Sequence, residues 1–381
     1  MSDSLVLTNA KIILPEEMVE GTVHIAHGRI DDIAEGASSA AGAIDFNGDY
    51  LMPGIVDLHT DSLEKHVMPR PGVHFNTVLA AMAHDAQIIS SGITTVLDAI
   101  CIGSSLRNPE RNEILMPMVE GIRTARARGL LRADHLLHMR CEITDGRVVE
   151  MFEPFATDPL TRMMSVMDHS PGQRQSPDLE KYKKKQLSYR AFEPEELDRA
   201  IEELMEASRT LGPVNRAALI EIGRANGIPL ASHDDETTDH ITQASGEGVV
   251  ICEFPTTFEA AESARAHGLA ILMGSPNIIR GGSHTGNVGA AALARRGLLD
   301  IVSSDYVPIS LLQSAFALTA EDIGYDLTHA IRTVTLNPAT AVGLTDRGSI
   351  ASGKRADLVR VSMVEGLPVV RSVWTEGRQT Y

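Results

Sequence analysis

The sequence has few cysteines and no long apolar run. Its three cysteines, Cys101, Cys141 and Cys252, are far apart and form no CxxC pair, so no disulfide framework is indicated. A reducing cytoplasm is the expected setting. No apolar run approaches the roughly 18 residues of a membrane-spanning helix. The first residues also lack the basic and apolar regions of a secretory signal. We therefore expect a cytoplasmic protein that does not bind membranes.

An excess of positive charge is also missing. The chain has 34 Lys and Arg residues against 51 Asp and Glu, which gives a formal net charge of −17. Nucleic-acid binders need a basic field, so this class is not expected. An anionic small molecule held in a locally basic pocket is compatible with this charge. Hydrophobic residues at 43% and charged residues at 22% are ordinary globular usage, which excludes general disorder.

Three common motifs are absent from the sequence. The Gly-rich segment 281–287 lacks the GK[ST] ending of a Walker loop, and no GxGxxG follows a predicted strand. No GxSxG elbow is present, so a serine hydrolase has no visible nucleophile.

The two ends of the chain share one sequence pattern, which differs from the pattern of the middle. Residues 5–52 and 346–381 read as short alternating strands separated by turn residues. We expect them to form one small β-sandwich domain from both termini (1–52 plus 346–381). Residues 53–345 would form the second domain.

The middle alternates apolar strands with amphipathic helices, such as 77–90, 113–128 and 194–210. The eight predicted strands end near His59, Asp98, Glu142, His169, His233, Glu253, Ser275 and Asp305. Eight βα units favour an α/β fold of the (β/α)8 TIM-barrel type. An open doubly wound sheet is the alternative. Residues 170–193 are polar and basic, and we expect an extended loop there, either a lid or a solvated excursion.

Polar residues with metal-binding side chains stand at several predicted strand ends. In a parallel barrel, the carboxyl ends of the strands meet at one face, where active sites lie. Imidazoles and carboxylates converging there would suit a divalent ion such as Zn²⁺ or Mn²⁺. The candidate ligands are His59, Asp61, Glu142, His169, His233 and Asp305. Taken singly, each could instead be a buried structural histidine or a helix N-cap.

Basic residues follow the same strand ends, although the chain as a whole is acidic. Arg binds phosphate with two hydrogen bonds, and a Gly-rich backbone can approach phosphate closely. We therefore predict an anionic, phosphorylated or phosphonylated substrate. Its candidate binding residues are Lys65, His66, Arg70, Arg140, Arg174, Arg280 and His284. Chance placement of a few basic residues near a site is the alternative.

Both ends of the predicted barrel resemble the amidohydrolase superfamily. Residues 53–59 (Pro-Gly-Ile-Val-Asp-Leu-His) are similar to its first-strand signature, and 337–339 with 347–359 to its return into the sandwich. The middle resembles one subfamily, the alpha-D-ribose 1-methylphosphonate 5-triphosphate diphosphatases of the carbon–phosphorus lyase pathway. The runs that carry this resemblance are 59–66, 69–71, 167–175, 231–235, 253–261, 274–277, 280–284 and 303–306.

The resemblance implies a metal-dependent hydrolysis in phosphonate metabolism. The triphosphate would be cleaved to alpha-D-ribose 1-methylphosphonate 5-phosphate and diphosphate, with one or two divalent ions on the six ligands given above. Asp305 would accept a proton from the attacking water, and the basic residues would neutralise the growing charge. Members of this superfamily often form homodimers or tetramers, so a homo-oligomer is expected.

Two features depart from the superfamily pattern. Asp61 stands where a second His is usual, and an oxygen ligand makes the site harder. The predicted strands place His169 and His233 on strands four and five, whereas the superfamily usually uses five and six. The alternatives for function are a C–N hydrolase of the same fold, acting on a cyclic amide, N-acyl group or amidine, and a metal-free scaffold.

Overall fold

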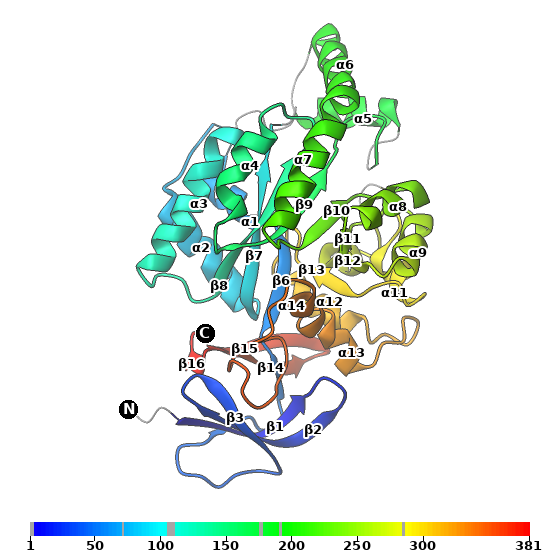
Figure 1. The fold of residues 1–381 in the computed structure, drawn as a ribbon. Helices are drawn as coiled ribbons and strands as arrows, with labels where there is room; N and C mark the ends of the chain where they lie inside the picture. Colours follow the sequence, from blue (N-terminus) through cyan, green and yellow to red (C-terminus); the bar gives the residue numbers. More distant parts are fainter. Residues whose placement is uncertain (1–3, 71, 105–110, 175–177, 190–192, 284–285) are drawn as a thin grey trace.

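The computed structural model describes residues 4–70, 72–104, 111–174, 178–189, 193–283 and 286–381. Within these ranges, eight parallel strands hydrogen-bond in sequence order and curve into a barrel (Figure 1). The prediction of a barrel rather than an open sheet is confirmed. The barrel strands are β6 (Ile55–Thr60), β7 (Ile93–Ile102), β8 (Asp134–Glu142), β9 (Thr161–Met167), β10 (Leu230–His233), β11 (Ile251–Glu253), β12 (Ala270–Gly274) and β13 (Ile301–Ser303).

The first and last barrel strands meet only at their carboxyl ends. There Asp305 N donates to His59 O at 2.9 Å, and Asp61 N donates to Asp305 O at 2.7 Å. At the opposite end, residues 333–334 lie between the two strands, because Val302 N donates to Thr333 O and Val56 N donates to Val334 O. The barrel is therefore closed at the face where the predicted site residues stand.

Helices follow most of the barrel strands and surround the barrel (Figure 1). The predicted helices over 77–90 and 194–210 are confirmed, and the one over 113–128 is confirmed with shifted ends. The helices are α1 (Ser62–Val67), α2 (Thr77–Ser90), α3 (Arg111–Ala127), α4 (Val148–Ala156), α5 (Leu179–Tyr189), α6 (Pro194–Thr210), α7 (Gly212–Ala225), α8 (Thr238–Gly246), α9 (Phe258–Ala266), α10 (Ser275–Ile279), α11 (Ala290–Ala294), α12 (Ser310–Ala317), α13 (Leu327–Arg332) and α14 (Leu336–Ala341).

The prediction of an extended loop over 170–193 was wrong for residues 179–189, which form α5. Tyr182 is the apolar contact of this helix, and it packs against Leu197 and Ile201 of α6. The rest of α5 is largely charged, so its own sequence shows little helical period. Packing against a neighbouring helix stabilises α5, although its own sequence has little helical periodicity.

Every barrel strand contributes to a core inside the barrel, including Leu136, Met163, Ala231 and Ile251. Side chains alternate between the two faces of a strand. Residues that lie two, four or six positions after these core residues therefore point into the same interior, at the carboxyl end of the barrel. This alternation brings His138, Arg140 and Glu142 of β8, His233 of β10 and Glu253 of β11 to one place.

A polar cluster occupies the outer side of the barrel between α2 and strands β7 and β8. Asp98 accepts a hydrogen bond from His84 Nε2 (2.7 Å) and from His135 Nδ1 (2.8 Å), and all three side chains are fully buried. Asp85 lies 3.4 Å from His135 Nε2 and also pairs with Arg132. This cluster fixes α2 to the barrel with hydrogen bonds where the neighbouring contacts are apolar.

The terminal segments form a second sheet beside the barrel. Its strand order is β16-β15-β14-β5-β1-β2-β3, with β4 paired to β1, and both ends of the chain contribute, as predicted. The strands are linked as one sheet rather than two, and most pairs are antiparallel. The strands are β1 (Ser4–Ile13), β2 (Met18–Ala26), β3 (Arg29–Glu35), β4 (Ile44–Asp45), β5 (Tyr50–Pro53), β14 (Leu358–Val364), β15 (Leu367–Thr375) and β16 (Arg378–Gln379).

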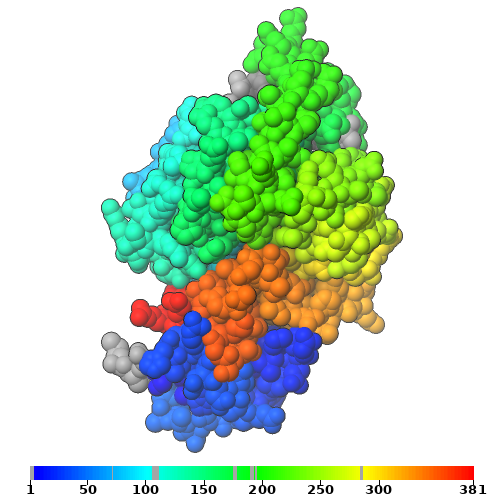
Figure 2. Space-filling view, in the orientation of Figure 1, coloured from blue at the N-terminus to red at the C-terminus, as the bar shows by residue number. Residues whose placement is uncertain are grey.

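The terminal sheet has its own core, in which Phe46 stacks on Trp374. The barrel connects to it through the segment after α14, which lies between the two parts in Figure 2. In that segment Arg347 donates to Asp134 Oδ2 (2.7 Å) and to Thr95 Oγ1 (2.9 Å) at the amino ends of two barrel strands. The three cysteines are free and buried. No helix among the described residues is long and apolar enough to cross a membrane.

Candidate active site

A cavity of about 500 Å³ opens at the carboxyl end of the barrel. All six predicted metal ligands line it, so the structure brings together side chains that the sequence separates by up to 246 residues. His169 follows the fourth barrel strand and His233 ends the fifth, as the predicted strand order requires. The departure from the usual superfamily positions therefore belongs to the chain.

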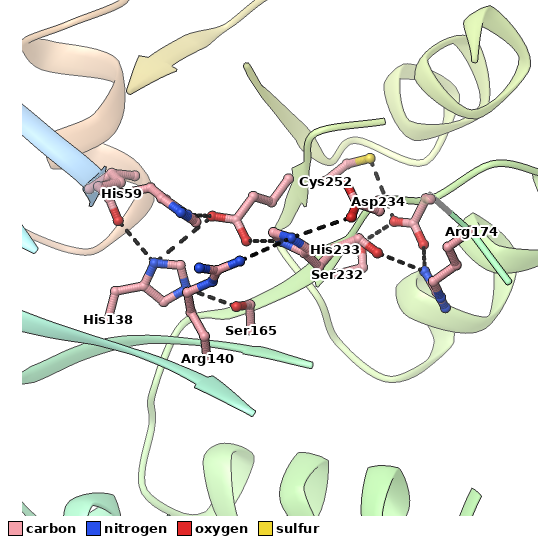
Figure 3. Close-up of polar contacts among 12 residues, drawn as sticks. His59, His138, Arg140, Ser165, Arg174, Ser232, His233, Asp234 and Cys252 are labelled. Carbon is pink, nitrogen blue, oxygen red and sulfur yellow. Dashed lines mark hydrogen bonds and ion pairs between the residues drawn. The ribbon is translucent and has the colours of Figure 1, made fainter. Parts of the chain in front are cut away.

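One buried carboxylate joins two of the imidazoles. Glu253 Oε1 lies 2.7 Å from His59 Nδ1, and Glu253 Oε2 lies 2.6 Å from His233 Nδ1. The two rings are nearly parallel, with an interplanar angle of 15°, and Phe254 packs edge-on against both. Figure 3 labels His59 and His233 and marks their polar contacts with dashed lines. Both Nε2 atoms are thus left for the cavity side.

A second carboxylate holds the third imidazole in the same way. Glu142 Oε2 lies 2.7 Å from His169 Nδ1, while Glu142 Oε1 accepts from Thr144 Oγ1 and from the His169 amide. Burial works against the imidazolium of His169, but the charge of Glu142 outweighs it and raises the pKa of this histidine. Glu142 is therefore placed as the partner of His169, and both its oxygens are already engaged.

The free imidazole nitrogens face carboxylates in two groups. In the first, His59 Nε2 lies 3.5 Å from Asp61 Oδ1, and Asp305 completes the group. In the second, Asp234 Oδ2 lies 3.5 Å from His233 Nε2 and 3.7 Å from His169 Nε2. The ligand atoms of each group lie within 4.8 Å of one another.

These donor sets fit divalent metal ions. Asp234 Oδ2 is buried and has no hydrogen-bond partner among the described residues, although an unsatisfied buried carboxylate oxygen is costly. A cation between Asp234, His169 and His233 would satisfy it. Burial disfavours a charged His59, but Glu253 outweighs burial and raises the His59 pKa to about 10. Because a metal binds the deprotonated nitrogen, loading this position releases a proton.

Asp305 stands at the seam where the barrel closes. It adopts a left-handed backbone conformation with φ of 57°, directly after the last strand. Burial, followed by the nearby charge of Asp61, raises the pKa of the Asp305 carboxyl to about 6. A carboxyl with a raised pKa that lines a cavity is suited to accept and return a proton near neutral pH.

Arg140 lies in the centre of the site. Its guanidinium donates to Asp61 Oδ1 at 2.8 Å. It also approaches His233 Nε2 at 3.4 Å (Figure 3). Burial disfavours this charge, but nearby acidic groups, Asp61 among them, more than compensate and raise the Arg140 pKa. A permanent positive charge is therefore fixed between the two ligand groups.

Four further cations line the same cavity: Lys65, Arg111, Lys185 and Arg280. Lys65 and Arg280 were predicted from the sequence. Arg111 and Lys185 were missed, because they lie in helices α3 and α5, away from the strand ends. Lys185 comes from the segment predicted as a loop, and α5 therefore contributes to the cavity wall.

Three predicted substrate residues do not line the cavity. His66 Nε2 lies 3.2 Å from Gln87 Oε1, and Arg70 is exposed outside the cavity. Arg174 is buried and pairs with Asp235 while donating to His233 O, so its charge is already used in holding β10. We therefore remove all three from the substrate site. His284 lies outside the described residues.

Two further site residues were missed by sequence reasoning, Glu253 and Asp234. Glu253 does end a predicted strand, so its position carried a signal, but a lone Glu without a neighbouring His gave no reason to select it. Asp234 follows His233 directly and adopts φ of 55°, which turns its carboxylate back toward the ring. Two consecutive residues of a strand point to opposite faces, so the sequence argued against using both.

Comparison with known proteins places the chain in a family. The model of the amidohydrolase family matches residues 145–381. The chain belongs to the amidohydrolase family. The likeness extends over the whole sequence: this amidohydrolase is 42% identical to the alpha-D-ribose 1-methylphosphonate 5-triphosphate diphosphatase of Escherichia coli (strain K12), covering 99% of this chain and 100% of that protein.

Other proteins resemble the chain in part of its sequence or in fold. Adenine deaminase of Methylobacterium nodulans is 32% identical over 145 residues, which cover 35% of this chain and 26% of that protein. The N-acetylglucosamine-6-phosphate deacetylase of Pasteurella multocida has a TM-score of 0.62 at 14% identity and covers 99% of each chain. The N-isopropylammelide isopropylaminohydrolase of Burkholderia multivorans also reaches 0.62, at 15% identity, over 100% of this chain and 98% of that one. These structures share the fold.

Proposed function

We propose that this amidohydrolase hydrolyses alpha-D-ribose 1-methylphosphonate 5-triphosphate to alpha-D-ribose 1-methylphosphonate 5-phosphate and diphosphate. The observation that carries the proposal is the charge of the cavity. Five cationic side chains line a cavity of about 500 Å³ in a chain with a net charge of −17. A neutral amide does not need them. The full-length similarity to the Escherichia coli diphosphatase supports the same substrate.

The reaction would use one or two divalent ions, with Zn²⁺ or Mn²⁺ as the proposed occupants. His59, Asp61 and Asp305 would hold one ion, and His169, His233 and Asp234 the other. Asp61 in place of a second His adds an oxygen ligand and thereby loosens a strict preference for zinc. When bound, such an ion acts as a Lewis acid and makes water a nucleophile at neutral pH.

The chain's own residues position and neutralise the reacting groups. Arg140, between the two ligand groups, would hold the phosphoryl oxygens where charge develops. Lys65, Arg111, Lys185 and Arg280 would hold the remaining phosphates, because positioning and electrostatics dominate phosphoryl transfer. Asp305 would take a proton from the water that attacks the α-phosphorus. The bond from this phosphorus to the β-bridging oxygen breaks, and diphosphate leaves.

The setting of this activity is proposed on indirect grounds. Three free, buried cysteines suit a reducing compartment, and we propose the cytoplasm. We also propose a homo-oligomer, in keeping with the superfamily. Light scattering after size-exclusion chromatography would measure its mass, and a mass of 41.1 kDa in solution would contradict the second proposal.

Phosphorus NMR of the metal-loaded protein tests the function. The sugar triphosphate, ATP and a panel of small amides would be offered in parallel, with the Asp305→Asn variant as a control for contaminating phosphatases. We expect diphosphate and the 5-phosphate in equal amounts from the sugar triphosphate. Release of inorganic phosphate would contradict cleavage between the α and β phosphorus. Turnover of an amide without turnover of a triphosphate would replace the proposal with C–N hydrolysis.

A further inference from the structure

The two candidate ligand groups have separate cavity-side ligands but share one support. His59 belongs to the first group and His233 to the second, and these histidines come from β6 and β10. Behind them, the two oxygens of Glu253 take one Nδ1 each, at 2.7 and 2.6 Å. Glu253 is fully buried, so water cannot replace either hydrogen bond.

We propose that Glu253 is a positioning residue that couples the two metal positions by fixing the tautomer of both histidines. A carboxylate only accepts hydrogen bonds, so each ring must place a proton on Nδ1, and a metal that binds the ring must take the deprotonated Nε2 on the cavity side. Metal-bound histidines generally need such an orienting acceptor. Here one acceptor serves both groups. The inference rests on the metal-dependent part of the proposed function and is independent of the substrate.

The surroundings leave few other groups to orient these rings. Phe254 packs edge-on against both, with ring centroids 5.0 and 5.4 Å away, and supplies no acceptor. His138 is engaged elsewhere, since its Nδ1 lies 3.1 Å from Leu58 O and its Nε2 lies 2.9 Å from Ser165 Oγ. Arg140 and Asp61 contact only the Nε2 atoms, so the Nδ1 side of both rings depends on Glu253.

Glu253→Gln gives a specific expectation. An amide has one accepting oxygen and one donating nitrogen. Only one of the two histidines keeps its proton on Nδ1, whereas the other must turn its Nδ1 lone pair to the amide and place the proton on Nε2. That ring can no longer bind a metal through Nε2. We expect one ion to bind at least about ten-fold more weakly, while the other keeps its affinity within a few-fold.

The matched control is Asp98→Asn. Asp98 also joins two fully buried histidines, His84 and His135, but it faces α2 and does not line the cavity. Zinc alone would be titrated into the metal-free proteins, with affinity from a competing chelator and stoichiometry from elemental analysis. Asp98→Asn should bind zinc as the wild type does. Unchanged stoichiometry and affinity in Glu253→Gln would overturn the proposal.

A second pair of variants leaves Glu253 in place, in case Glu253→Gln does not fold. In His59→Asn, the amide nitrogen takes the place of Nδ1 and still donates to Glu253. In His59→Gln, the amide takes the place of Nε2, and Glu253 loses that donor. Both remove a ligand of the first ion. We expect the second ion to bind normally in His59→Asn. In His59→Gln we expect it to bind at least about ten-fold more weakly, because the Glu253 carboxylate is no longer held on the β6 side and can turn away from His233 Nδ1. Equal affinities in the two variants would overturn the coupling.

Nitrogen NMR of the zinc-loaded protein, labelled in histidine, provides a readout independent of activity. The wild type should show His59 and His233 with protonated Nδ1 and metal-bound Nε2. In Glu253→Gln, one of these two signals should report a proton on Nε2. If both keep the wild-type tautomer, Glu253 does not fix it and the proposal fails.

Discussion

Arg140 Nη1 donates a hydrogen bond of 2.8 Å to Asp61 Oδ1, from the third barrel strand to the residue that follows the first. This contact joins the two sets of residues that the sequence suggested separately, the cations for the substrate and the carboxylates for the metal. A carboxylate beside a fixed guanidinium stays ionised, so Asp61 is held in the form that binds a cation. The same guanidinium also contacts Cys101 Sγ at 3.5 Å and His233 Nε2 at 3.4 Å.

Arg140→Gln should strongly impair catalysis. The substitution removes a buried positive charge from the centre of the site, and losing one such electrostatic contact costs about 10²–10³-fold in rate. Steady-state kinetics with the sugar triphosphate would measure kcat and kcat/KM. Arg209→Gln is the control, because Arg209 is exposed on α6 and outside the cavity. Kinetics indistinguishable from wild type would remove Arg140 from the proposed mechanism.

Asp305→Asn should lower kcat by about 10²–10⁴-fold, the usual contribution of a positioned proton acceptor. The amide keeps the size of the side chain but cannot accept the proton. The backbone hydrogen bonds of residue 305 that close the barrel remain, so the far-UV circular dichroism should match the wild type. Asp322→Asn on the surface serves as the control. Wild-type turnover in Asp305→Asn would exclude the assigned role.

The polar cluster between α2 and strands β7 and β8 predicts a pH dependence of stability. Burial lowers the pKa of His135, but Asp98 and Asp85 outweigh burial and raise it to about 9, above 6.5 in the unfolded chain. The folded protein therefore holds this proton more tightly. Its stabilising contribution is complete below pH 6.5 and is lost as the pH rises through about 9. A shift of this size corresponds to at most about 3 kcal/mol.

Urea denaturation between pH 6 and 9.5 would measure that loss as a falling midpoint. In His135→Asn, the amide still donates to Asp98 but does not titrate, so the fall over this range should become shallower. A wild-type slope in the variant would show that other groups cause the pH dependence.

Gly54→Ala should destabilise the fold. A Cβ at this position would lie 2.1 Å from Thr94 Oγ1 and 2.8 Å from Thr94 Cβ, at the amino end of the first barrel strand. Overpacking of this kind costs about 1–3 kcal/mol. Thermal unfolding would register it as a lower midpoint. Gly246→Ala is the control, since a Cβ there meets no atom within 4 Å and the backbone is not in the left-handed region. A midpoint equal to the wild type would contradict the close contact.

The fold could be predicted because its signals are local and repeated. Helices 77–90 and 194–210 were found to the residue, since their amphipathic period is complete within the segment. Helix α5 was missed because its stabilising contact, Tyr182 on Leu197 and Ile201, comes from another helix. The pairing of the terminal strands into one sheet depends on the same kind of distant contact.

The site was predicted only as far as residue type and strand position decide it. The six residues predicted as metal ligands do line the cavity, because strand ends gather at one face. Position along the chain could not reveal how each charge is used. Arg174 stands near a strand end like Arg140, yet its guanidinium is paired with Asp235. Glu253 resembles any other strand-end acid until the two rings beside it are seen.

The contact that closes the barrel also places a residue of the active site, so the site is complete only when the barrel is closed. Asp305 and His59 are 246 positions apart in the chain, and the hydrogen bond between their backbones is also what joins the last strand to the first. A chain still emerging from the ribosome, or one cut before its eighth strand, has neither the proton acceptor nor the closed rim. Contacts this distant in sequence form late in folding, because loop closure must come first. Catalytic competence should therefore appear together with the finished fold and never ahead of it.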